Sequence, residues 1–178
     1  MRGQPASASA VGLARTLGRT VPRRMQSRFR FTYESDWRDA PMAYWVHVPD
    51  PADPDSYTPP APARLSSRGF VFLRVEFGPH ELVFSSPEQL EHCIAVLSTK
   101  PLPTTRALSA RRGTGAGPNR HWLSRLPAEL KSPAARFLLV RHLKSVYAMA
   151  VTGTRARPGK PKLPPLWPGL TPLSPSAA

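Results

Sequence analysis

The strongest potential for chemistry in this sequence lies in residues 100–131. The segment carries seven basic side chains but a single acid, Glu129, and its prolines and glycines keep the backbone open. His121 and Trp122 stand among the cations. A guanidinium group binds phosphate and an indole ring stacks on bases, a combination used in single-stranded nucleic-acid grooves. We therefore predict nucleic-acid contact through residues 100–144, and the candidate residues are Arg106, Arg111, Arg112, Arg120, His121, Trp122, Arg125, Lys131, Arg141 and Lys144.

Trp122 has a second interpretation. With Leu123 and Leu126 it forms an i, i+1, i+4 apolar pattern, which is typical of a short helical turn with one buried side. In that case the indole would anchor the loop in the core instead of stacking on a base. The sequence leaves both interpretations open.

The charges are sorted along the chain. Residues 1–33 contribute +7, residues 34–91 contribute −6 and residues 92–178 contribute +13, within a net charge of +14. Such a field attracts polyanions and speeds their encounter, but it does not select among them. Arginine outnumbers lysine twenty to five, as a GC-rich genome would also produce. The alternative is therefore a protein–protein interaction module of unknown partner, whose high pI reflects codon usage.

The sequence presents no catalytic nucleophile with a matching base. Cys93 is the one thiol, and it stands beside His92. Neighbouring residues of a helix point about 100° apart, so these two do not face each other. The apolar periodicity directs Cys93 inward and His92 outward. We interpret Cys93 as a small core hydrophobe.

Metal and nucleotide signatures are also missing from the sequence. The five histidines show no paired spacing, and one cysteine supplies no zinc ligand set. Asp50, Asp53 and Asp55 are separated by prolines on a stretch that reads as solvated loop. The glycine-rich run at residues 113–117 lacks the Lys-Ser/Thr of a phosphate loop. We predict a non-enzymatic protein with no cofactor, no metal and no small-molecule substrate.

Composition divides the chain into three parts. Residues 1–27 are rich in arginine and free of acids. We interpret them as a disordered basic arm that is a mis-assigned start or idle tail, a mitochondrial transit peptide, or an arm that binds a polyanion. Residues 28–151 form one predicted domain, with a proline-rich loop at 49–64 and the basic loop at 100–131. Residues 152–178 are proline-rich and basic, and we predict a disordered tail. No apolar run is long enough to span a bilayer.

Periodicity predicts the elements of the domain. Alternating side chains indicate strands at 28–33 and 42–48 and a hairpin at 69–85. Helices are expected after Ser86-Pro87 and Ser132-Pro133, since each pair combines an N-cap residue with proline at the first helical position. Gly153 is a plausible stop for the second helix.

Together these features predict an α+β fold, in which a small antiparallel sheet of three to four strands is covered by two helices and flanked by disordered tails. The expected partners are nucleic acid or another protein, without a membrane, and the expected location is cytoplasmic, or mitochondrial if residues 1–27 direct import. Strand order and oligomeric state do not follow from the sequence.

Overall fold

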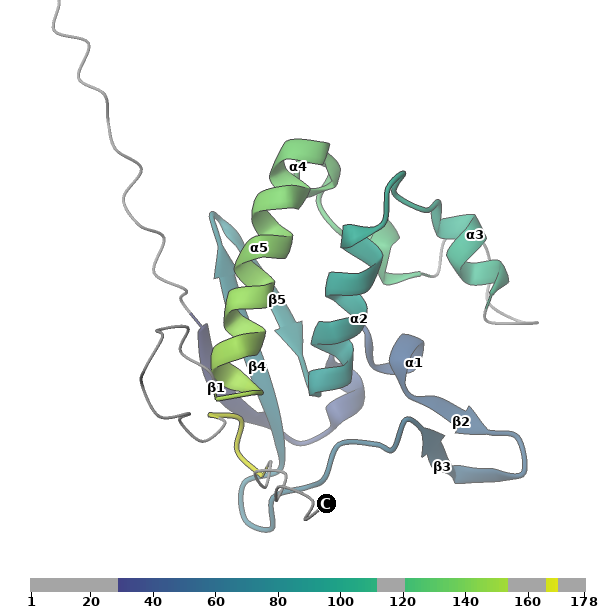
Figure 1. Cartoon of the computed structure of the whole chain (residues 1–178). Helices are drawn as coiled ribbons and strands as arrows, with labels where there is room; N and C mark the ends of the chain where they lie inside the picture. Colours follow the sequence, from purple (N-terminus) through teal and green to yellow (C-terminus); the bar gives the residue numbers. More distant parts are fainter. Residues whose placement is uncertain (1–28, 112–120, 154–165, 170–178) are drawn as a thin grey trace, which may run out of the picture.

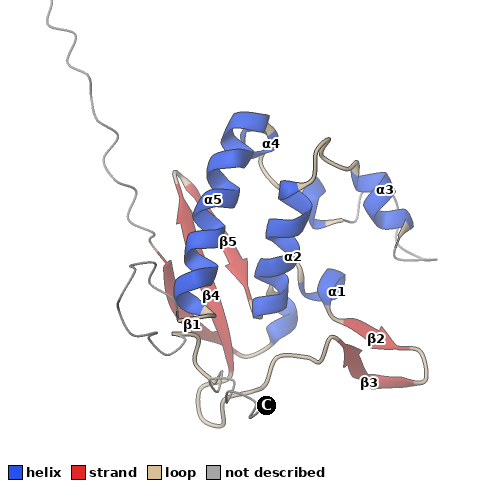
Figure 2. Cartoon of the chain, viewed as in Figure 1, coloured by secondary structure: helices blue, strands red, loops and turns tan. Residues whose placement is uncertain are grey.

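The computed structural model describes residues 29–111, 121–153 and 166–169 (Figure 1). Two antiparallel sheets combine with helices (Figure 2), which confirms the predicted α+β class. The described elements are β1 (Phe29–Glu34), η1 (Trp37–Asp39), α1 (Ala43–Val46), β2 (Val48–Asp50), β3 (Asp53–Thr58), β4 (Phe70–Phe77), β5 (His80–Phe84), α2 (Pro87–Ser98), α3 (Thr105–Ala110), η2 (Trp122–Ser124), α4 (Ala128–Lys131) and α5 (Pro133–Ala150).

The main sheet has the strand order β1-β4-β5, and both pairs are antiparallel. Leu73 of β4 lies opposite Phe31 of β1 and Phe84 of β5. Because side chains alternate along a strand, the buried residues Val71, Leu73 and Val75 all point to one side of the sheet. The turn between β4 and β5 contains Gly78 at a φ of 60°, a conformation that glycine adopts at little cost. The predicted hairpin and the first predicted strand are thus confirmed.

Two helices cover this apolar side of the sheet. Ser86 caps α2 by accepting a hydrogen bond from the Gln89 amide, and Ser132 caps α5 in the same way through the Ala135 amide. The buried side of α2 includes Leu90 and Cys93, and that of α5 includes Leu139, Leu143 and Val146. α2 and α5 pack against each other over the sheet (Figure 1). Both predicted helix starts and the inward position of Cys93 are confirmed.

A smaller apolar cluster lies on the other side of the sheet. Phe72 alternates with Leu73 and therefore points away from α2 and α5. Trp37, Ala40 and Ala43 bury it, with Val83 of β5 at the border. The segment that contains η1 and α1 thus closes the second side of the sheet near Phe72.

The strand predicted at 42–48 is wrong, because residues 43–46 form the single-turn helix α1. Met42 and Ala43 pack into the two different apolar clusters, and this tertiary contact overrides the alternating pattern. His47 then fixes the end of the turn, with Nδ1 3.1 Å from the Pro59 carbonyl and Nε2 2.9 Å from Ser86 Oγ. Since the carbonyl can only accept, Nδ1 carries the proton and Ser86 donates to Nε2.

The loop predicted at 49–64 is also wrong in part, because β2 and β3 form a two-stranded hairpin there. Prolines are tolerated because each strand of an isolated pair keeps one edge free of ladder bonds. Asp50 accepts a hydrogen bond from the Ala52 amide, and Asp53 accepts one from the Asp55 amide. These aspartates therefore stabilise the turn region, and they are exposed, as predicted.

The tail prediction of residues 152–178 does not hold at 166–169. Trp167 is buried at 5% exposure, its ring centroid lies 5.6 Å from that of Phe31, and its amide donates to the Ala150 carbonyl at 2.7 Å. The segment therefore packs between β1 and the end of α5. Residues 1–27 and most of the tail lie outside the described residues. None of the described helices has the length and apolar character needed to cross a membrane.

Candidate nucleic-acid interface

The predicted site residues fall on several elements. Arg106 lies on α3 and Arg111 directly follows it, Arg125 follows η2, and Lys131 ends α4. Arg141 and Lys144 lie on α5. Arg112 and Arg120 lie outside the described residues. The described candidates are therefore distributed over several elements between α3 and α5.

The α5 residues share one face of a long helix. Arg141 and Lys144 are exposed and lie three positions apart, so their side chains are neighbours. Phe137 precedes Arg141 by one turn and is 61% exposed, and Leu138 beside it is 44% exposed. The opposite face of α5 carries the buried Leu139, Leu143 and Val146. α5 therefore presents two cations and an aromatic ring to solvent on a rigid element.

A second group of cations lies at the α3 end of the molecule. Arg106 and Arg111 are exposed, and so is Arg125 at the end of η2. Figure 1 shows α3 and α5 well apart, with α2 between them in this view. Lys131 is half-buried, and its Nζ donates to the Ser124 carbonyl at 3.4 Å, which ties the end of α4 to η2. The structure thus gathers the predicted cations into two groups.

Five of the exposed cations form no ion pair with a carboxylate in the described part of the chain. They are Arg106, Arg111, Arg125, Arg141 and Lys144. Glu129, the one acid after residue 91, lies 3.1 Å from Nε2 of His80 at the sheet hairpin. These five cations are therefore available to an external anion. We call this set the helical cations.

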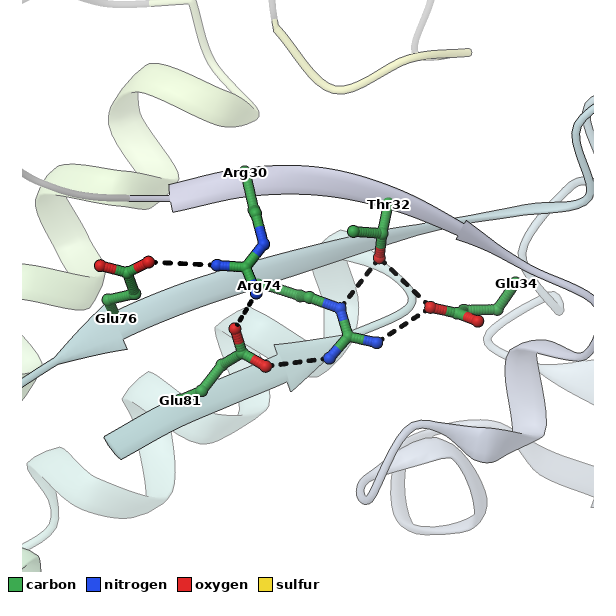
Figure 3. A network of polar contacts seen from close by, with 6 residues as sticks. All are labelled: Arg30, Thr32, Glu34, Arg74, Glu76 and Glu81. Atoms are coloured by element: carbon green, nitrogen blue, oxygen red, sulfur yellow. Dashed lines mark hydrogen bonds and ion pairs between the residues drawn. The ribbon is translucent and has the colours of Figure 1, made fainter. Parts of the chain in front are cut away.

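The arginines of the sheet are arranged differently (Figure 3). Arg30 contacts Glu76 at 3.1 Å and Glu81 at 2.6 Å. Arg74 contacts Glu34 and Glu81, both at 2.9 Å. The hydrogen bonds to Glu34 and Glu81 raise the pKa of Arg74 above its ordinary value. Their charges are thus balanced locally, on the side of the sheet away from α2 and α5.

His121 and Trp122 lie in the interior, with exposures of 2% and 4%. The His121 ring lies 4.5 Å from that of Trp45 and 5.2 Å from that of Trp122, measured between centroids. Nδ1 of His121 also accepts a hydrogen bond from the Leu123 amide and so caps η2. This is the anchoring role that the sequence allowed for Trp122. In this arrangement the indole offers no face to a nucleic-acid base.

His92 joins this aromatic cluster, contrary to the outward direction predicted for it. Its ring lies 6.1 Å from Trp122 and 6.2 Å from His121, centroid to centroid. Nε2 of His92 and Nε1 of Trp122 are both buried without a hydrogen-bond partner. Burial lowers the pKa of His92 below its ordinary value, because the interior disfavours the charged form. The structure therefore keeps His92 neutral near pH 7.

The remaining reactive groups are buried or isolated. Cys93 is fully buried, and burial raises the pKa of its thiol far above the ordinary range. Burial and, next, the hydrogen bond to Glu91 raise the pKa of Tyr147 to about 12. Across the residues that the structure describes, no three His, Cys, Asp or Glu side chains are grouped as metal ligands would be.

Neither a protein-family model, nor a curated protein, nor a solved structure matches this chain. Any function assigned to it therefore depends on its own geometry and charge.

Proposed function

We propose that this protein is a non-enzymatic nucleic-acid-binding accessory protein, which contacts the phosphate backbone through the helical cations and neighbouring basic residues of 100–144. The observation that carries the proposal is that none of these five exposed side chains has a carboxylate partner among the residues that the structure describes. Cations held apart from acids lose little when they exchange solvent ions for phosphate, and the release of counterions from the nucleic acid drives binding.

Local charge balance supports the same assignment. The segment from residue 92 onward has one acid, Glu129, and this carboxylate reaches back to His80 instead of neutralising an arginine. Four acids of the first half, Glu34, Asp36, Glu76 and Glu81, pair with Arg30, Arg38 and Arg74. The exposed cations of α3, η2 and α5 form no ion pair in the described part of the chain, so their charge remains open to a polyanion.

A salt titration tests the proposal. The full chain should bind short DNA or RNA at about 50 mM salt, and its affinity should fall steeply as salt rises, with a log–log slope of about −3 to −6. Fluorescence anisotropy of a labelled oligonucleotide measures both quantities. An affinity that ignores salt, or no binding at the lowest salt, would show that the helical cations do not contact phosphate.

A protein-interaction module is the second candidate, and exposed apolar residues favour it. Phe137 and Leu138 lie side by side on α5 at 61% and 44% exposure, and protein interfaces use such patches. Co-purification with and without nuclease separates the two functions. A single stoichiometric protein that remains after nuclease treatment would favour this candidate.

A further inference from the structure

Phe137 is the aromatic residue that remains available beside the helical cations. Residues 100–144 contain two aromatic side chains of the Phe, Tyr and Trp type, Trp122 and Phe137. Trp122 is 4% exposed and lies in the interior cluster, whereas Phe137 is 61% exposed on α5. Leaving a ring this size in water gives up the stabilisation that its burial would provide. An exposed ring within a cationic surface therefore calls for a ligand with both anionic and flat apolar parts.

The spacing on α5 sets what that ligand is. Arg141 lies four positions after Phe137 and Lys144 lies seven positions after it, so all three side chains project from one face at intervals of about one turn, or roughly 5.4 Å. Neither cation has a carboxylate partner within the described residues. A base stacked on the ring would place its neighbouring phosphates within reach of the two cations.

We propose that α5 is a stacking platform for single-stranded nucleic acid, with Phe137 as the residue that contacts a base and Arg141 and Lys144 as the residues that contact the adjoining phosphates. This inference rests on the proposed function and adds the class of nucleic acid to it. A duplex keeps its bases stacked on one another, so it can use the two cations but not the ring. An unpaired strand can use all three, because any base has a face to stack on.

Three probes of equal length test the inference with the full chain: a single-stranded oligothymidine, the same strand paired with its complement, and a strand whose sugars lack bases. Wild type should bind the single strand more tightly than the other two. Phe137→Ala should weaken binding to the intact single strand roughly five- to 100-fold, with little change for the duplex and the abasic strand. Phe137→Tyr should retain the wild-type order of affinities, because it keeps the ring.

Leu138→Ala is the matched control, since it removes a neighbouring apolar side chain that is 44% exposed. It should leave all three affinities unchanged. Thermal melts verify that each variant is folded, which is expected because both side chains are largely exposed.

The outcomes separate the inference from the function beneath it. If Phe137→Ala has no effect, or weakens all three probes equally, the protein binds phosphate alone and the stacking platform is wrong while the proposed function stands. If Leu138→Ala costs as much as Phe137→Ala, the patch is an apolar docking surface for a protein. If wild type binds none of the probes, the proposed function fails and the inference fails with it.

Discussion

The outer side of the sheet and the helical segment from α3 to α5 use arginine in opposite ways. On the sheet, Arg30 and Arg74 are held by Glu34, Glu76 and Glu81 in one connected network (Figure 3). In the helical segment, exposed cations such as Arg141 have no carboxylate partner in the described residues. The net charge of +14 therefore says less about binding than the position of each cation does.

The difference also separates two physical roles. Exposed ion pairs contribute little to folding, because water screens them and the long side chains must be ordered. The sheet network mainly fixes neighbouring strands and cancels local charge. Cations without carboxylate partners add no ion-pair stabilisation to the fold, but they create the electrostatic field that attracts a polyanion. Substitutions in the helical segment should therefore change nucleic-acid binding, whereas substitutions in the sheet network should change stability.

The largest effect is expected when four of the five helical cations are removed together. Changing Arg106, Arg111, Arg141 and Lys144 to alanine should weaken nucleic-acid binding about 100-fold at moderate salt and reduce the log–log salt slope by about 3 to 4. The reason is that a protein with fewer phosphate contacts releases fewer counterions from the nucleic acid when it binds. Anisotropy titrations at several salt concentrations measure both changes.

The matched control removes four arginines outside the helical segment, Arg30, Arg38, Arg64 and Arg68, and so lowers the net charge equally. Arg30 and Arg38 pair with carboxylates, whereas Arg64 and Arg68 form no ion pair within the described residues. Its affinity should stay within about threefold of wild type, because these side chains lie outside the helical segment. Equal losses in the two variants would show that only net charge matters, and the contrast between the two regions would then have no functional meaning.

Trp167 packs between β1 and the end of α5, and it tests whether stability and nucleic-acid binding are separable. It contacts Phe31 of β1 on one side, and its amide donates to Ala150 at the end of α5 on the other. Trp167→Ala should lower the free energy of unfolding by about 3 kcal/mol, as expected for a buried tryptophan. Urea denaturation measures this loss.

Leu166→Ala is the control, since that side chain is 56% exposed and its loss should change stability by no more than about 0.5 kcal/mol. Folded Trp167→Ala should still bind nucleic acid like wild type. A Trp167 variant as stable as wild type would mean that the segment at 166–169 contributes nothing to the core.

A smaller loss of stability is expected on the sheet. Arg74→Ala removes the partner of Glu34 and Glu81 and a hydrogen bond to Thr32. We expect the free energy of unfolding to fall by about 0.5–1 kcal/mol, since the network is partly exposed to water. Nucleic-acid affinity should not change. If the Arg74→Ala variant is stable but binds nucleic acid more weakly, the phosphate contact lies on the sheet and not on the helical cations.

The sequence was sufficient for the elements whose local signals agree with their packing. The hairpin of β4 and β5 and the starts of α2 and α5 were predicted because alternation, turn residues and N-caps all specify them locally. The segment 42–58 was not, because its structure depends on contacts distant in the chain. His47, for example, which directly follows the short helix α1, is in hydrogen-bond contact with Ser86, 39 positions away.

The sequence was sufficient to predict which segment is basic, but not which of its side chains are exposed and without a carboxylate partner. Counting charges located the basic segment, yet no local pattern states whether an arginine has a partner, and the pairs of Arg30 join residues 46 and 51 positions apart. Trp122 and Phe137 show the same limit. The sequence allowed Trp122 to be either buried or available, and only packing with His92 and His121 decides that it is buried.

Stability should also depend on pH, through two histidines that lie on the helices α2 and α5. Burial lowers the pKa of His92 on α2 and of His142 on α5 below the ordinary value of 6.5. The unfolded chain therefore takes up protons first as pH falls through 6.5, and the free energy of unfolding decreases from there toward the lower folded pKa values. The groups around these rings are His121 and Trp122 for His92, and Phe77 and the Glu76 backbone for His142.

Thermal melts at about pH 7.5 and 5.5 should show a modest decrease in Tm on acidification. His92→Leu should reduce that decrease, because Nε2 of His92 has no hydrogen-bond partner that the substitution would remove. A Tm that rises on acidification would mean that these histidines gain charge in the folded state, which would place them in contact with an acid instead of in the core.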